Sequence, residues 1–221
     1  MRYFLDYCGI TVLPFLQVPS PKCEIMADEW WRRGNECGII GDMRKVGIFG
    51  GSFNPIHSGH LGIARRAVEE LSLDRLLFVP AKVNPFKAFS GSVPGGLSDD
   101  LRWELVRLVA GLDPRFEAWD FEIRQSPGPS YAIDTVLATE ARFPGASLFY
   151  IIGEDNVAAL HQWKDWDLLS RKCTFVPYPR TRESSTEIRR RLLAGEPVDD
   201  LVPPCVAVAL KGADLKVSLS G

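Results

Sequence analysis

Several features are scarce or missing in this chain of 221 residues, and each absence excludes a class of protein. The five cysteines are odd in number and include no C-x-x-C pair, which argues against a disulfide framework or a zinc knuckle and favours a reducing, cytoplasmic location. No apolar run approaches the roughly 20 residues of a membrane helix. The first 16 residues do not resemble a secretory signal peptide. We therefore expect a chain that neither spans a membrane nor is secreted.

Charge of one sign is also not in excess. The 26 Lys and Arg residues nearly balance the 28 Asp and Glu residues, so the formal net charge is −2. A nucleic-acid-binding protein would be expected to carry a basic stripe or a recognition motif, and neither is found. Any polyanion that this chain binds must therefore be held by a local arrangement of groups. The hydrophobic content of 46% is enough for one sizeable core.

The chain changes character at Met43. Residues 1–42 hold three of the five cysteines and show no sustained periodicity, so no fold is predicted for them. They are either an N-terminal extension of unknown structure or a stretch upstream of the true start of translation, and we favour the second explanation. One domain is predicted over residues 43–221.

From Val46 onward, short β-branched or aromatic runs alternate with helical patterns, which is typical of βαβ units. The pattern predicts an α/β fold with a Rossmann-like parallel sheet and helices on both of its faces. By composition, residues 88–98 form a loop that could cover a ligand. The predicted strands are 45–50, 75–80, 117–123, 147–152 and 173–177, and the predicted helices are 59–71, 99–110, 131–142, 155–161 and 185–194.

A glycine turn with two histidines, GGSFNPIHSGH, follows the first predicted strand over residues 50–60. Ligands of doubly wound sheets bind at this end of a strand, where bare backbone N–H groups and a helix N-terminus can hold phosphate. His57 and His60 are three residues apart, so both rings can face one point and donate N–H groups to a phosphoryl group. The structural alternative is a tight loop with one histidine capping the helix and the other in the core.

The string from Met43 to Leu61 resembles the opening of the H-x-G-H nucleotidyltransferases, most closely the bacterial nicotinate-nucleotide adenylyltransferases. Three further blocks are similar to motifs of that family. In 84–87 (NPFK), the resemblance implies that Lys87 meets a triphosphate. In 130–135 (SYAIDT), it implies that backbone amides receive a pyridine carboxylate, although Ser130 is also a natural N-cap. In 151–156 (IIGEDN), it implies that Asp155 binds the adenylate ribose.

Two elements later in the chain extend the resemblance. Trp163 corresponds to a family tryptophan that lies beside the pyridine, although a core position is the common fate of a tryptophan. The string 184–189 (SSTEIR) resembles an element that closes over the ATP phosphates. Ser184 and Glu187 could equally form a capping box.

The resemblance covers roughly Met43 to Lys216, and the chain departs from the family in three places. Ala132 replaces a family threonine, but its backbone N–H remains. Only residues 177–183 join the last predicted strand to the SSTEIR element, where the family usually has a longer stretch with an extra strand. That short connection raises the question of whether Ser185, Thr186 and Arg189 reach the site. The first 42 residues have no family counterpart.

The resemblance implies adenylyl transfer from ATP to nicotinate mononucleotide, which gives nicotinate adenine dinucleotide and pyrophosphate, with Mg²⁺ as the cofactor. The implied catalytic residues are His57, His60, Lys87 and Arg189. The implied ATP-binding residues are Gly50, Gly51, Ser52, Phe53, Gly153, Asp155, Ser185, Thr186 and Arg189. The implied nicotinate mononucleotide-binding residues are Asn84, Tyr131, Ala132 and Trp163, and no resident metal ligand is implied.

Several questions stay open from the sequence, and one is how strictly a carboxylate on the pyridine ring is preferred to a carboxamide. The acceptor could be another phosphorylated compound such as phosphopantetheine, although His57 argues against this because those enzymes resemble T-x-G-H. The protein could instead bind ATP with impaired turnover. The chain could also form a homo-oligomer.

Overall fold

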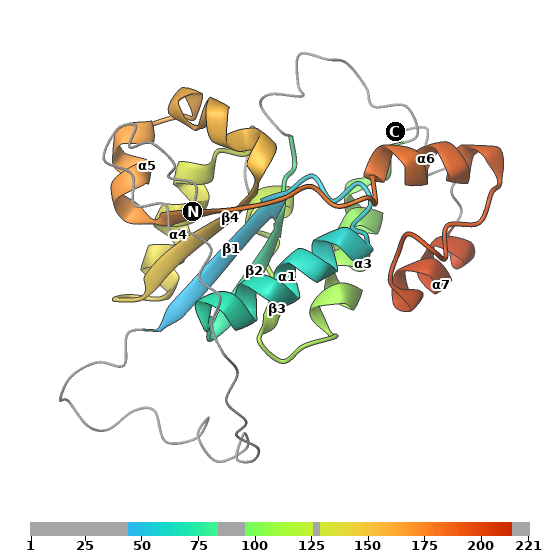
Figure 1. Cartoon of the computed structure of the whole chain (residues 1–221), viewed down its shortest axis with the longest axis horizontal. Coiled ribbons are helices and arrows are strands. Elements are labelled where there is room, and N and C mark those ends of the chain that lie inside the picture. The colour runs from blue at the N-terminus through green and yellow to red at the C-terminus, as the bar shows by residue number, and fades with distance from the viewer. Residues whose placement is uncertain (1–43, 84–95, 126–128, 214–221) are drawn as a thin grey trace, which may run out of the picture.

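The computed structural model of the chain describes residues 44–83, 96–125 and 129–213. Within these residues, five parallel strands form one sheet in the order β3-β2-β1-β4-β5, with the first strand at its centre. This confirms the predicted α/β fold with a Rossmann-like parallel sheet. Figure 1 shows the strands side by side with helices around them. The strands are β1 (Lys45–Gly51), β2 (Arg75–Pro80), β3 (Phe116–Ala118), β4 (Ser147–Gly153) and β5 (Thr174–Tyr178).

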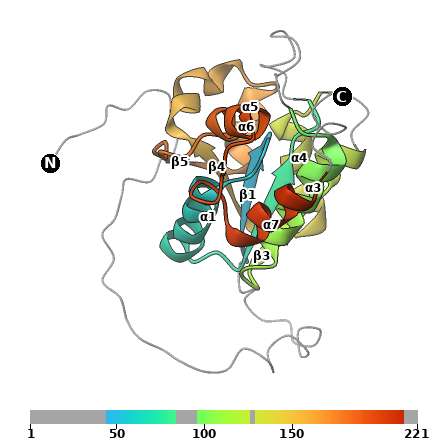
Figure 2. The ribbon, with the colours of Figure 1, turned by 90° about the vertical axis from the view of Figure 1, so that its right-hand side faces the viewer.

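Helices cover both faces of the sheet, because successive side chains of each strand point to opposite faces. In β2, for example, Leu76 and Phe78 belong to one hydrophobic cluster and Leu77 and Val79 to the other. The first cluster is completed by α1 (Ser58–Leu71), α3 (Asp99–Ala110), α6 (Ser185–Ala194) and α7 (Pro204–Gly212). The second is completed by α4 (Ala132–Arg142), α5 (Trp166–Lys172) and the 3₁₀ helix η3 (Glu154–Gln162). In Figure 2, α1 lies to the left of β1 and α7 lies toward the viewer.

Two of the predicted elements differ in kind or extent. The strand predicted over 117–123 ends at Ala118 and is followed by a π-helical turn, η2 (Phe121–Gln125). There the Glu122 carboxylate accepts hydrogen bonds from Thr135 and Ser130, and this buried polar contact replaces an extended course of the chain. The helix predicted over 155–161 is the 3₁₀ helix η3.

The helix ends are capped in different ways. Gly111 and Gly195 are the C-cap residues of α3 and α6. Ser130 is not the N-cap of α4, because Tyr131 holds that position and the Ser130 hydroxyl accepts instead from the Lys82 N–H (3.0 Å). Ser184 is the N-cap of α6 but makes no side-chain capping bond, so the capping box, which was the structural alternative for SSTEIR, does not form.

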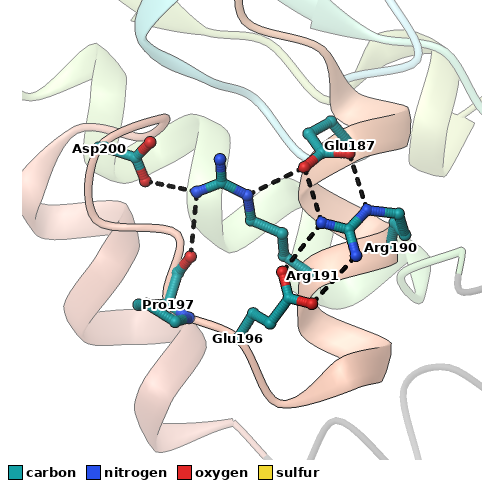
Figure 3. A network of polar contacts seen from close by, with 6 residues as sticks. All are labelled: Glu187, Arg190, Arg191, Glu196, Pro197 and Asp200. Atoms are coloured by element: carbon teal, nitrogen blue, oxygen red, sulfur yellow. Dashed lines mark hydrogen bonds and ion pairs between the residues drawn. The ribbon is translucent and has the colours of Figure 1, made fainter.

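The acidic partner that a capping box would require, Glu187, is engaged elsewhere. Figure 3 shows its carboxylate between two arginines, Arg190 and Arg191, which also reach Glu196 and Asp200 in the turn after α6. These charge-assisted bonds lower the pKa of Glu187 to about 2. The network joins α6 to the segment that leads into α7, and in Figure 1 these two helices lie at one end of the molecule.

No helix within the described ranges is long and apolar enough to cross a bilayer.

Candidate functional site

The glycine turn after β1 lies against a buried tyrosine. A Cβ atom placed on Gly50 would come within 2.5 Å of the Tyr150 hydroxyl, so any larger residue would displace either the loop or the tyrosine. Phe53 has a left-handed backbone (φ 41°) and a buried side chain, which packs edge-on against the His60 ring. Aromatic packing against Tyr150 and His60 therefore holds the loop in place. The loop lies at the carboxyl end of the central strand.

The two histidines share one place, as their spacing predicts. His60 Nδ1 accepts a hydrogen bond from the His57 backbone N–H (3.2 Å), and the two ring centroids are 3.7 Å apart at an interplanar angle of 32°. His57 occupies the N-cap position of α1. Both imidazoles therefore sit at the positive end of α1, where an anion is stabilised.

Burial controls the charge of His57. Its side chain is only 6% exposed, and its Nδ1 has no hydrogen-bond partner among the described residues. Desolvation lowers the pKa of His57 to about 4, although the nearby Glu183 carboxylate acts in the opposite direction. At neutral pH this imidazole is therefore uncharged and has one ring N–H to donate.

The start of α6 packs directly on the glycine turn. The Ser185 hydroxyl donates to the Pro55 carbonyl (3.0 Å), and the Arg189 guanidinium donates to the Asn54 carbonyl (2.7 Å) and to Thr186 Oγ1 (3.2 Å). The short connection is thus long enough to bring this element to the loop. The next two arginines of α6 face the acidic network of Figure 3 instead, so Arg189 alone of the three reaches the turn.

The connection itself crosses the first turn of α1. A Cβ atom on Gly59 would lie 2.0 Å from Thr181 Oγ1 and 3.0 Å from Glu183 Oε2, so only glycine permits this close approach. Glu183 therefore places a carboxylate beside the same helix end as the two imidazoles. The sequence gives no signal for Glu183. The residue precedes Ser184, the candidate N-cap of α6, and belongs to no motif.

The end of β4 carries the predicted ribose-binding residue. Gly153 pairs in register with Tyr178 of β5, and η3 begins immediately after it. Asp155 Oδ2 lies 3.2 Å from the guanidinium of Arg180, which belongs to the same short connection. Asp155 is exposed and already has a cationic partner from the segment that crosses α1.

On the other face of the sheet, the predicted pyridine-binding residues gather around one cluster. Tyr131, Ala132 and Trp163 all pack against the cluster that contains Tyr150. The Trp163 ring stands edge-on to the rings of Tyr150 and Phe175, with centroids 5.8 Å apart in each case. Tyr150 therefore contacts the tryptophan with its ring and approaches Gly50 with its hydroxyl, which links the two halves of the candidate site.

Sequence reasoning missed a buried arginine that supports the loop. The Arg102 side chain from α3 is 4% exposed and donates to the carbonyls of Ser52 (2.5 Å) and Ala81 (2.8 Å). It thereby ties the turn after β1 to the end of β2. Arg102 belongs to no motif in the sequence, and its role depends on packing that the local pattern does not encode.

Two predicted site residues, Asn84 and Lys87, lie outside the described residues, as do residues 88–95 of the expected covering loop. Their proposed roles stay predictions.

Comparison with known proteins gives a consistent result. Residues 48–191 match the family described as Cytidylyltransferase-like. A protein of Methylacidiphilum infernorum named "Probable nicotinate-nucleotide adenylyltransferase" is 37% identical over 187 residues, which covers 76% of this chain and 89% of that protein. A protein of Thermus thermophilus with the same name is 38% identical over 186 residues, which covers 76% and 96% of the two chains.

Among solved structures, the chain is similar to the nicotinic acid mononucleotide adenylyltransferase of Plasmodium falciparum complexed with NaAD. The TM-score is 0.60 at 14% sequence identity, with 80% of this chain and 100% of that chain covered. At this level of identity the similarity concerns the fold alone.

The burial of His57 predicts acid sensitivity. Because its folded-state pKa of about 4 is below the unfolded value near 6.5, the unfolded chain binds an extra proton between these pH values. Stability is therefore lost as the pH falls from 6.5 to 4. Relative to His57→Gln, we expect the free energy of unfolding of the wild type to drop by on the order of 2 kcal/mol over this range. Urea unfolding at several pH values measures it.

The matched control is His161→Gln, since His161 is exposed on η3. Its unfolding curve should follow that of the wild type at every pH. If the wild type and His57→Gln lose stability in parallel, burial does not control the titration of His57.

Proposed function

Because the chain belongs to the cytidylyltransferase-like family and, within it, to the nicotinate-nucleotide adenylyltransferases, we propose that it transfers the adenylyl group of ATP to nicotinate mononucleotide. The products are nicotinate adenine dinucleotide and pyrophosphate. One observation supports this proposal most strongly. The end of the central strand brings together two stacked imidazoles at a helix N-terminus, the bare glycine turn and Arg189 of α6.

The chemistry asks for positioning and charge stabilisation. The phosphate of nicotinate mononucleotide is already an anion at neutral pH, so its oxygen can attack the α-phosphorus of ATP without a general base. The P–O bond to pyrophosphate breaks as the new P–O bond forms. Catalysis then consists of aligning two polyanions and stabilising the charge on the five-coordinate phosphorus.

We assign the ATP side of the site to the face of α1 and α6. The N–H groups of Gly50, Gly51, Ser52 and Phe53 and the rings of His57 and His60 are suited to the phosphates. Ser185, Thr186 and Arg189 would close on them from α6, with the guanidinium offering paired N–H donors. Gly153 and Asp155 at the end of β4 would receive the adenosine, and Arg180 would then exchange its contact with Asp155 for one with the nucleotide.

We assign the acceptor side to the start of α4. The backbone N–H groups of Tyr131 and Ala132 would receive the pyridine carboxylate, and the N-cap position makes no side-chain capping bond that would compete with it. Trp163 would lie beside the ring. Asn84 and Lys87 would complete the acceptor and triphosphate contacts.

We propose that a magnesium ion accompanies ATP at this site. It would be held mainly by the phosphate oxygens of ATP, where it would neutralise their charge. Among the described residues, no group of three or more His, Cys, Asp or Glu side chains is placed to hold a metal. The free cysteines Cys173 and Cys205 fit the reducing cytoplasm that we propose as the location.

An acceptor assay tests the proposal. Pyrophosphate release is measured with ATP, Mg²⁺ and one acceptor at a time: nicotinate mononucleotide, nicotinamide mononucleotide or phosphopantetheine. We expect turnover with a pyridine mononucleotide and none with phosphopantetheine, because the acceptor side offers aromatic faces and a helix N-terminus. Turnover with phosphopantetheine alone would assign the chain to another acceptor. ATP binding without any product would assign it to a binding function.

Removing one imidazole should affect turnover far more than folding. For His60→Ala we expect kcat to fall on the order of a hundredfold, because a donor to the transition-state charge is lost. His161→Ala is the matched control, since it removes the third histidine of the chain from an exposed position on η3. Near-normal turnover of His60→Ala, measured by pyrophosphate release, would refute the assigned role.

The carboxylate of Glu183 should oppose triphosphate binding, because it lies at the helix end that the phosphates would use. For Glu183→Gln we expect the KM for ATP to fall about threefold, with little change in kcat. Glu104→Gln on α3 makes the same change in net charge at an exposed ion pair and should leave the KM unchanged. A raised KM would mean that Glu183 holds the connection in place instead.

A further inference from the structure

An ammonium group lies at the start of α4, where the proposed acceptor side begins. Lys164 Nζ is 4.5 Å from the centroid of the Tyr131 ring and 3.8 Å from Asp134 Oδ2. Tyr131 is the N-cap residue of α4, and Asp134 belongs to its first turn. The Lys164 side chain is 46% exposed, so an incoming ligand can reach it.

The chain delivers this charge together with an aromatic face. Trp163 is the C-cap residue of η3 and is held by the edge-on contacts with Tyr150 and Phe175. Lys164 follows it directly, so the position of the indole limits where the ammonium can go. The long side chain of Lys164 lies across Tyr131 in a cation–π contact, which further restricts it.

The Lys164 ammonium changes the balance of charges that an anion would meet at the N-terminus of α4. The N-terminus of α4 carries a partial positive charge of about half a unit, which favours an anion. The Asp134 carboxylate in the first turn opposes an anion there. Lys164 contacts Asp134 and is the cation that the structure places on Tyr131, so it offsets this opposition.

We propose that Lys164 is a specificity-determining residue that makes the site prefer the ionised carboxylate of nicotinate mononucleotide to the neutral carboxamide of nicotinamide mononucleotide. This inference rests on the proposed function. The two nucleotides have the same phosphate, ribose and aromatic ring and differ by one negative charge on the ring substituent. A cation beside the helix N-terminus distinguishes them by that charge, whereas stacking on Trp163 and Tyr131 does not.

The same reasoning predicts which kinetic constant changes. Lys164 lies beside the proposed pyridine-binding residues. The residues proposed to bind the phosphates lie on the opposite face of the sheet. Its loss should therefore weaken binding of the acid and leave the chemical step unaffected. The KM for nicotinate mononucleotide should rise while kcat is retained, and the constants for the amide should not change.

The experiment compares both nucleotides as acceptors in the wild type and in Lys164→Met, which keeps much of the aliphatic stem and removes the charge. We expect the ratio of kcat/KM for the acid to that for the amide to fall about tenfold. Lys164→Arg should restore most of the ratio. Direct binding of each nucleotide, followed by tryptophan fluorescence without ATP, should show the same loss for the acid alone.

Two control variants separate charge from structure. Asp134→Asn removes the carboxylate that competes for the ammonium, so it should keep or raise the preference for the acid. Lys172→Met makes the same change in net charge on α5, where the lysine pairs with Glu140, and should leave the ratio unchanged.

Each other outcome overturns the inference. An unchanged ratio in Lys164→Met would show that the backbone N–H groups alone select the acid, and an equal loss for both nucleotides would show a packing role. A wild type that uses both nucleotides equally well would remove the preference while leaving the proposed function intact. A wild type that uses neither would overturn the proposed function itself.

Discussion

The contact between α6 and the turn after β1 is the constraint on which the candidate site depends. Residues 130 and 135 positions apart meet there, because Ser185 donates to the Pro55 carbonyl and Arg189 to the Asn54 carbonyl. The acidic network of Glu187, Glu196 and Asp200 supports this arrangement, since it occupies the two following arginines and joins α6 to the segment before α7. A connection of only a few residues is therefore sufficient to bring α6 to the glycine turn, where we propose that phosphate binds.

Local electrostatics explain how a chain with a net charge of −2 could bind two polyanions. In the function we propose, helix N-termini, backbone N–H groups and a small number of side chains hold the two polyanions at short range. Burial leaves His57 neutral, so that residue offers a hydrogen bond and no charge, and Glu183 adds a negative charge at the same helix end. Among the described residues, our proposal assigns positive charge to Arg189 on one face of the sheet and to Lys164 on the other.

Local pattern failed where a polar side chain had a distant partner. Ser130 is an N-cap by its position in the sequence, yet its hydroxyl accepts from Lys82 because the end of β2 lies beside it. Glu122 turns inward to Thr135 and ends the third strand early. Glu187 does not form the capping box that was the structural alternative for SSTEIR, because Arg190 and Arg191 of its own helix hold its carboxylate. In each case a charge-assisted or buried hydrogen bond outweighs a local preference of about 1 kcal/mol.

The sequence by itself determined the parallel α/β sheet, the boundaries of most elements, and the family, because strand alternation, helical periodicity and the glycine turn with two histidines are local signals. Only the tertiary structure decided which groups share a space. The hydroxyl of Tyr150 under Gly50, Arg102 on the carbonyls of Ser52 and Ala81, and Glu183 against Gly59 depend on packing between segments that are distant along the chain. Contacts between distant segments leave no periodic pattern in the local sequence, because they depend on how the folded elements pack.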